Sequence, residues 1–304
     1  MERIIFIDID DTLDGREIKY ILRERLGVSS RLTSKLKARE DGILLNGEKA
    51  YVVHKVRSGD VLTLKLSEDE DKSENIVATE GNVDIIYEDD DLILINKQAG
   101  VSVHPSMGNF YNTLANYVVY HYGKLGQTFT FRPINRLDKN TSGLMLVAKN
   151  SYAQDAMTKL HTMGLLKRSY IALVWGDMEE GKGSIDAPIA RADASAIKRE
   201  VNEQGRYAKT DYEVIKRYGG ATLVRVKPVT GRTHQIRVHM AHIGHPLLGD
   251  FLYGRETPEI ITRHALHSYR IEFTLPFSNE EKVFETALPE DMMRAIEYFG
   301  GDTF

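Results

Sequence analysis

The 304-residue sequence is consistent with an α+β fold in two parts that are joined by an acidic segment. Apolar residues at helical spacing occur within 16–39, and an alternating strand follows at 61–66. Beyond Val83, short strand-like runs alternate with few helical stretches. The segment 67–82 begins with a run of acidic residues and indicates a flexible linker. We therefore expect a small domain over 1–66 and a large one over 83–304.

Basic side chains gather in the first part. Apolar residues at helical spacing predict one helix that Gly27 ends, and Ser29 or Ser30 can cap the next one. In that second helix Arg31, Lys35 and Arg39 are four residues apart and should share one face. A solvated basic helix face is the alternative explanation of this pattern. The apolar residues of the first helix are Ile18, Ile21, Leu22 and Leu26.

A small sheet should follow the two helices. Asn46-Gly47 is a strong signal for a hairpin, and residues 61–66 form the closing strand. The helix pair, the Leu-Leu-Asn-Gly hairpin and the Gly-Asp that precedes the closing strand together resemble the S4 RNA-binding domain. This resemblance implies that Arg31, Lys35 and Arg39 contact RNA.

Composition excludes several classes of protein. Apolar content of 42% and charged content of 28% are ordinary for a globular protein. The absence of cysteine excludes disulfides and thiolate metal sites. The N-terminal residues do not resemble a signal peptide, and no apolar run approaches the roughly 18 residues of a membrane span. We therefore expect a cytoplasmic protein without a membrane contact. A net charge of −4 argues against RNA binding unless the basic residues are clustered, as they are here.

Asp138 lies in a segment that is typical of a functional loop. It has basic residues on both sides, and Asn-Thr-Ser-Gly and an apolar run at 144–148 follow it. This pattern indicates a carboxylate held on a loop at the edge of a strand. A lone Asp of this kind is usually a salt-bridged surface residue. The flanking residues, however, form Arg-Leu-Asp-x-x-Thr-Ser-Gly, which resembles the catalytic motif of pseudouridine synthases of the RluA/RluD type. In that family this Asp is essential.

Three further segments resemble motifs of the same family. Residues 86–105 contain an acidic turn, Asp89-Asp90-Asp91, and a strand that ends in Asn-Lys. Residues 166–176 resemble the basic-x-Tyr-x-Ala-x-Val-x-Gly strand. Residues 226–239 contain Thr-Gly-Arg-Thr-His-Gln-Ile-Arg, which matches the family signature almost letter for letter. Three residues depart from the usual pattern: Gln98 replaces Pro, Asn135 replaces His, and Arg168 replaces Lys.

The resemblance implies a catalytic domain that is built on a mixed, largely antiparallel sheet. It also implies an isomerase that converts uridine in RNA to pseudouridine without a cofactor or a metal. Asp138 would act as nucleophile or base, Tyr170 would stack on the uracil, and Arg237 would pair with Asp138. The uridine must leave the base stack to be reached. Ribosomal RNA is the expected substrate, transfer RNA is the alternative, and a monomer is expected. Residues expected near substrate or RNA are Lys97, Asn135, Arg136, Arg168, Arg232, His234 and Gln235.

Some segments of the chain also match the patterns of other functions. The spacing His239-x-x-His242-x-x-His245 resembles that of zinc ligands. The chain has no Cys, however, and helix packing explains the spacing. Residues 4–13 reproduce the Asp-x-Asp-x-Thr-Leu pattern of Mg²⁺-dependent haloacid-dehalogenase phosphatases. The basic helix follows too soon to leave room for that fold. A non-catalytic RNA-binding or ribosome-assembly factor remains the third possibility, which a turnover assay decides.

Overall fold

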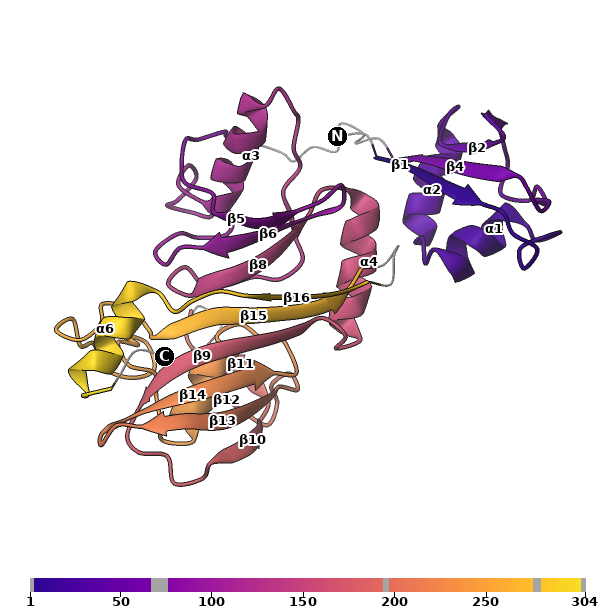
Figure 1. The fold of residues 1–304 in the computed structure, drawn as a ribbon. Coiled ribbons are helices and arrows are strands. Elements are labelled where there is room, and N and C mark those ends of the chain that lie inside the picture. Colours follow the sequence, from indigo (N-terminus) through magenta and orange to yellow (C-terminus); the bar gives the residue numbers. More distant parts are fainter. Residues whose placement is uncertain (1–2, 67–75, 194–196, 276–279, 302–304) are drawn as a thin grey trace.

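The computed structural model describes residues 3–66, 76–193, 197–275 and 280–301, which form an α+β fold with two main sheets (Figure 1). The smaller sheet is antiparallel and has the order β1-β4-β2-β3. Two short helical segments pack against it. The elements of this N-terminal domain are β1 (Arg3–Asp8), α1 (Ile18–Tyr20), a π-helical turn (Ile21–Arg25), α2 (Ser30–Ala38), β2 (Ile43–Leu45), β3 (Glu48–Lys49) and β4 (Val61–Leu66).

Local chemistry explains the boundaries of these elements. Gly27 follows the first helical segment with a φ of 63°, and the Ser29 hydroxyl accepts a hydrogen bond from Leu32 N at 3.1 Å to begin α2. Asn46 and Gly47 both have positive φ, as a tight hairpin requires. The prediction for Arg39 was wrong in one respect. It lies beyond α2 with an extended backbone and pairs with Asp41 at 3.0 Å, so it does not continue the helix face.

The larger sheet has the order β10-β13-β14-β9-β15-β8-β6-β5, with β16 beside β15 and β7 beside β8 (Figure 1). Only the β8–β15 pair is parallel among the pairings within the described residues of this sheet. This confirms the prediction of a mixed, largely antiparallel sheet. Its strands are β5 (Ile85–Glu88), β6 (Leu92–Lys97), β7 (Arg132–Pro133), β8 (Ser142–Ala148), β9 (Lys167–Trp175), β10 (Lys182–Asp186), β13 (Lys209–Arg217), β14 (Ala221–Pro228), β15 (Leu266–Thr274) and β16 (Glu281–Glu285).

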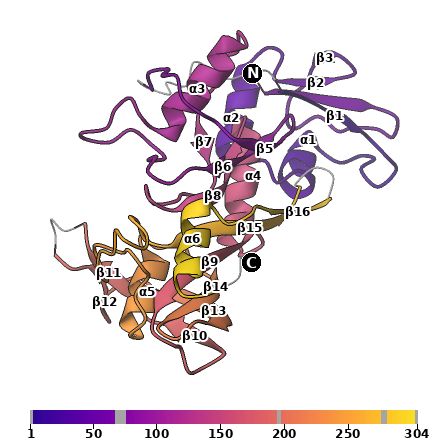
Figure 2. The same cartoon turned by 60° about the vertical axis from the view of Figure 1, so that its left-hand side comes forward.

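Helices and a side hairpin cover this sheet (Figure 2). They are α3 (Leu114–Lys124), α4 (Ser151–Thr162), α5 (Gln235–His242), α6 (Glu290–Tyr298) and the hairpin of β11 (Ile189–Arg191) and β12 (Arg199–Val201). The central strands β6, β8, β9 and β14 are almost entirely buried, since apolar clusters lie on both faces. None of the described helices is long and apolar enough to cross a membrane.

The second half of the predicted linker 67–82 is packed against the large domain and is not a free linker. Residues 67–75 lie outside the described residues, but 76–82 pack on α3. Asn116 Nδ2 donates to Val77 O at 2.7 Å, and Ile76 joins the apolar cluster there. A Cβ at Gly81 would lie 2.3 Å from the Tyr117 ring, so only glycine fits this close approach. The second half therefore belongs to the large domain.

Helix α4 joins the two domains. The Tyr152 hydroxyl donates to Leu26 O at 2.7 Å, and the ring is buried in the apolar core of the N-terminal domain. The Ser29 hydroxyl donates to Asp155, and Arg3 pairs with Asp91 at 3.2 Å. Both views show α4 between the large sheet and the N-terminal domain (Figures 1 and 2).

Candidate active site

Asp138 lies on the loop between β7 and β8 and lines a cavity of about 650 Å³. Thr141 N donates to Asp138 O at 3.1 Å, which closes a turn at the loop. Gly143, the second residue of β8, has a φ of 106°, and a Cβ there would lie 2.2 Å from Ser268 O. The Ser-Gly of the motif therefore allows β8 to approach β15 closely, and this contact fixes where the loop ends.

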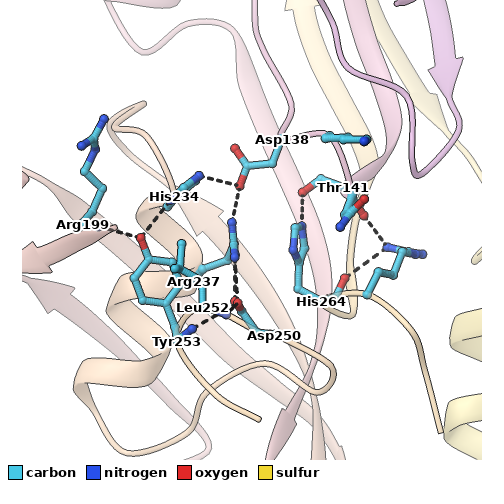
Figure 3. A network of polar contacts seen from close by, with 12 residues as sticks. Asp138, Thr141, Arg199, His234, Arg237, Asp250, Leu252, Tyr253 and His264 are labelled. Atoms are coloured by element: carbon cyan, nitrogen blue, oxygen red, sulfur yellow. Dashed lines mark hydrogen bonds and ion pairs between the residues drawn. The ribbon is translucent and has the colours of Figure 1, made fainter. Parts of the chain in front are cut away.

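Arg237, on α5, brings two carboxylates together (Figure 3). Its Nη1 donates to Asp138 Oδ2 at 3.1 Å. Its Nε and Nη2 form a fork with the two carboxylate oxygens of Asp250, each at 2.7 Å. Asp250 also accepts from Leu252 N and Tyr253 N. Asp250 therefore fixes the orientation of the guanidinium, and the Nη1 group remains to contact Asp138.

Electrostatics support this arrangement. Burial alone would lower the pKa of Arg237, but the hydrogen bonds and charges of Asp250 and Asp138 outweigh it and raise that pKa above its ordinary value. Burial would raise the pKa of Asp250, but the Arg237 hydrogen bonds hold it below the usual range. Both partners are therefore ionised at neutral pH, and the Arg237–Asp250 pair holds the Asp138 carboxylate in position.

His234 is the second basic side chain beside Asp138. It precedes α5 with a left-handed backbone, φ 56°, and its Nε2 lies 3.9 Å from Asp138 Oδ2. Its Nδ1 shares a 2.8 Å hydrogen bond with the Tyr253 hydroxyl, which also accepts from Arg199 N. Burial lowers the pKa of His234, with Arg237 adding to the effect and Asp138 opposing it. The imidazole is therefore neutral at pH 7.

Tyr170 approaches the same cavity from the sheet. It lies on β9, its side chain is 5% exposed, and it pairs with Val226 of β14 and Ser268 of β15. Asp138, Tyr170 and Arg237, which the sequence predicts as catalytic, thus line one cavity although they come from three distant segments.

The prediction that Lys97 contacts RNA was wrong. Its side chain is 1% exposed, and Nζ donates to the carbonyl oxygens of Gln98, Val101 and Lys139 at 2.8, 2.9 and 3.0 Å. Burial, together with Arg263, lowers the pKa of Lys97 to about 7, and Asp138 opposes this. Lys97 therefore lies beneath the Asp138 loop and ties it to the segment after β6.

Arg263 holds the next residue of the same loop. Its Nη1 donates to Asn140 O at 3.0 Å and to Leu266 O at 3.1 Å, while Nε pairs with Asp291 of α6 at 2.6 Å. The Thr141 hydroxyl shares a 2.8 Å hydrogen bond with His264 Nε2 (Figure 3). The sequence predicted a functional role for neither Arg263 nor Asp250. Neither has a local pattern that distinguishes it from a surface ion-pairing residue.

Gln235 was expected to contact substrate, but its amide is fully engaged by the protein. Oε1 accepts from the Thr230 hydroxyl at 2.7 Å and Arg232 N at 2.9 Å. Nε2 donates to Lys209 O and the Thr210 hydroxyl, both at 2.9 Å. Gln235 therefore shapes the loop that carries His234 and has no amide group left for a ligand.

The remaining predicted residues lie in two places. Arg136 is exposed at the cavity, and Asn135 is buried with its Oδ1 accepting from Leu146 N. Arg168 and Arg232 also line the cavity, and Arg232 Nε donates to Tyr207 O. Arg31, Lys35 and Arg39 are not part of this cavity, because they lie in the N-terminal domain.

The competing motifs have structural explanations. The Asp10 carboxylate accepts from Thr12 N at 2.9 Å in an exposed turn after β1, which belongs to an antiparallel sheet. His239 binds Thr210 and Ala187 O through its two ring nitrogens. Within the residues that the structure describes, no group of three His, Asp or Glu side chains could hold a metal ion.

Comparisons with known proteins agree with the predicted family. Residues 91–242 match the family model described as RNA pseudouridylate synthase. The chain is 41% identical to the uncharacterized RNA pseudouridine synthase YjbO of Bacillus subtilis, over 90% of this chain and 95% of the relative. It is 35% identical to the ribosomal large subunit pseudouridine synthase D of Nitrosomonas europaea, over 97% and 88%.

A solved structure supports the same assignment. Human RNA pseudouridylate synthase domain containing 1 superimposes with a TM-score of 0.57 and 25% identity, covering 73% of this chain and 96% of that one. The family model, the sequence relatives and this fold agree with the motifs that line the cavity. The chain belongs to the RNA pseudouridylate synthase family and is an isomerase that forms pseudouridine in RNA.

Proposed function

We propose that Asp138 is the catalytic residue, that Arg237 positions it, and that Tyr170 contacts the uracil. The observation that supports this most strongly is the 3.1 Å contact between Asp138 and Arg237 in a cavity that Tyr170 also lines. A volume of about 650 Å³ lies in the range of small-molecule sites and suits one extruded nucleotide.

The geometry gives the two carboxylate oxygens different tasks. Asp138 Oδ2 is held by Arg237, whereas Oδ1 has no hydrogen-bond partner among the described residues, and the side chain is 28% exposed. Oδ1 is therefore the atom that attacks the sugar or removes a proton. When Oδ1 attacks C1′, the N-glycosidic bond breaks and the uracil turns within the cavity. C5 then bonds to C1′ and displaces the carboxylate, and the proton that C5 loses moves to Tyr170 or to water.

We further propose that the N-terminal domain is an S4-like RNA-binding domain and that ribosomal RNA is the substrate, with transfer RNA as the alternative. The helix pair with its hairpin sheet and the exposed Arg31 support the first proposal. A relative named ribosomal large subunit pseudouridine synthase D, similar along nearly the whole chain, supports the second. On the same basis we propose that the protein acts in the cytoplasm as a monomer, without a small-molecule cofactor.

Mapping pseudouridines across total cellular RNA, with and without the gene, tests the proposal. We expect one or a few uridines of large-subunit ribosomal RNA to lose the modification in the deletion strain. A plasmid with the wild-type gene should restore it, and one with Asp138→Asn should not. An unchanged map would contradict the substrate assignment, and restoration by Asp138→Asn would contradict the role of the carboxylate. Loss of sites in transfer RNA alone would favour the alternative.

A further inference from the structure

Arg168 is a cation without a counter-ion beside the active-site cavity. It is half-buried at the start of β9 and lines the cavity. Its Nε is buried and has no hydrogen-bond partner, and the described residues form no ion pair with it. A partly desolvated guanidinium in this state is unfavourable unless a ligand supplies the missing acceptor.

The surroundings of Arg168 form a small space that two side-chain nitrogens border. Arg168 Nη2 lies 3.7 Å, and His161 Nε2 3.8 Å, from the point that a Cβ on Gly231 would occupy. Thr158, one turn before His161 on α4, lines the same end of the cavity. Burial, with Arg168, lowers the pKa of His161 to about 4, so the imidazole is neutral. Because residue 231 has no side chain, the space between these nitrogens stays open.

The charges around this space favour an anion. Asp138 is the one acidic side chain among the described residues that line the cavity, and Arg237 holds it. Arg237 is itself neutralised by Asp250. The basic residues that remain at the cavity, Arg136, Lys139, Arg168 and Arg232, therefore give it a net positive charge.

The position of Arg168 on the strand suggests which anion. Arg168 and Tyr170 are two residues apart on β9, so they face the same side of the sheet about 7 Å apart. With the uracil against Tyr170, the backbone of an adjoining nucleotide falls within reach of Arg168. A guanidinium fork matches phosphate oxygens well.

We propose that Arg168 and His161, on the open side of Gly231, form a subsite for one RNA phosphate next to the target uridine. This subsite rests on the proposed function, because it requires an RNA strand that enters the cavity. The subsite would fix the direction in which the RNA strand crosses the β-sheet. It is distinct from any phosphate contacts made by the N-terminal domain.

The test uses a synthetic RNA fragment that contains the uridine identified by mapping. In two versions, the phosphate on its 5′ or its 3′ side is replaced by an uncharged methylphosphonate. For the wild-type protein we expect one version to bind about tenfold more weakly than the unmodified RNA. Arg168→Met should bind unmodified RNA equally weakly and should show no further loss with the modified RNA.

Salt dependence gives a second readout. The slope of log affinity against log salt should fall by about 0.7 in Arg168→Met, which is the contribution of one phosphate contact on a single strand. Arg168→Lys keeps the charge and should keep the slope. Gly231→Val keeps both Arg168 and His161 but fills the space between them, and it should weaken binding. The matched control is Arg294→Met on the exposed face of α6, which should change nothing.

Two results would overturn the subsite. One is equal affinity of wild-type protein for all three RNAs, a result that does not depend on any variant folding. The other is a loss of kcat in Arg168→Met at saturating RNA with unchanged affinity, which would place Arg168 at the reacting base instead. If wild-type protein binds the RNA without converting its uridine, the proposed function fails. If conversion is normal but neither phosphate matters, only the subsite fails.

Discussion

Two sets of basic residues in this protein differ in what surrounds them. Arg237, Arg263 and Lys97 are at most 5% exposed, and each donates to several acceptors around the Asp138 loop. The second set lies on α2, where Arg31 is exposed and has no such contacts. Buried and fully bonded cations fix the geometry of a reacting group, whereas exposed ones attract a polyanion. Changes in the first set should therefore lower kcat, and changes in the second should weaken RNA binding.

The largest effect is expected at Arg237. Arg237→Met removes the fork to Asp250 and leaves that carboxylate buried without a partner, so the free energy of unfolding should fall by about 3–5 kcal/mol. Turnover should fall at least about 100-fold, because Asp138 loses its fixed position. Chemical denaturation and turnover at saturating RNA measure these effects. Arg237→Lys is the matched control. It keeps the charge without the fork, so a fully active Arg237→Lys would mean that charge alone suffices.

Arg263 should show the next largest effect. Arg263→Lys loses the contact to Asn140 O or the pair with Asp291, and the Asp138 loop should then move. We expect kcat to fall about 10- to 100-fold while the Kd for RNA stays the same. Asp291→Asn, on α6, weakens the ion pair that holds Arg263 without touching the Asp138 loop. It should lower kcat by a smaller factor and also leave the Kd unchanged. Equal changes of kcat and Kd in both variants would indicate a general loss of structure instead.

Charge reversal on α2 tests whether the exposed basic residues attract RNA. Arg31→Glu with Lys35→Glu should weaken RNA binding about tenfold or more and reduce its salt dependence, with kcat at saturating RNA unchanged. Adding Arg39→Glu should contribute little, since Arg39 already pairs with Asp41. Fluorescence anisotropy at several salt concentrations measures this. An unchanged salt slope would mean that α2 does not face the RNA.

The smallest effect concerns Lys97. Because its pKa is lowered to about 7 in the fold, the unfolded chain binds more protons than the folded one between pH 7 and the ordinary lysine pKa. The contribution of Lys97 to the free energy of unfolding should therefore rise with pH in that range. Urea unfolding of the wild type and Lys97→Met at pH 6.5 and 9 should show a difference that grows at the higher pH. A difference that is independent of pH would contradict this account.

The parts of this structure that could be predicted are those with local signals. Asn46-Gly47 marked its hairpin, and the apolar run at 144–148 lies in β8. The mixed sheet as a whole was expected from the family resemblance and not from local signals. The contact between Asp138 and Arg237, 99 residues apart, was predicted only because both lie in motifs that resemble one family.

The support of the loop could not be predicted in the same way. Arg263 contacts a carbonyl 123 residues earlier in the chain, and no periodicity encodes such a contact. Lys97 was misassigned for a related reason. A lysine at the end of a strand is usually solvated, and only the packing of the Asp138 loop above it makes it buried.

Release of the C5 hydrogen reports most directly on the central claim that the Asp138 carboxylate performs the isomerisation. RNA with tritium at C5 of uridine, mixed with excess protein, releases tritium to water only when C5 bonds to C1′. Wild-type protein should release it within one turnover. Asp138→Asn should bind the RNA with the same Kd and release none. Release by Asp138→Asn at a rate near that of the wild type would contradict the account.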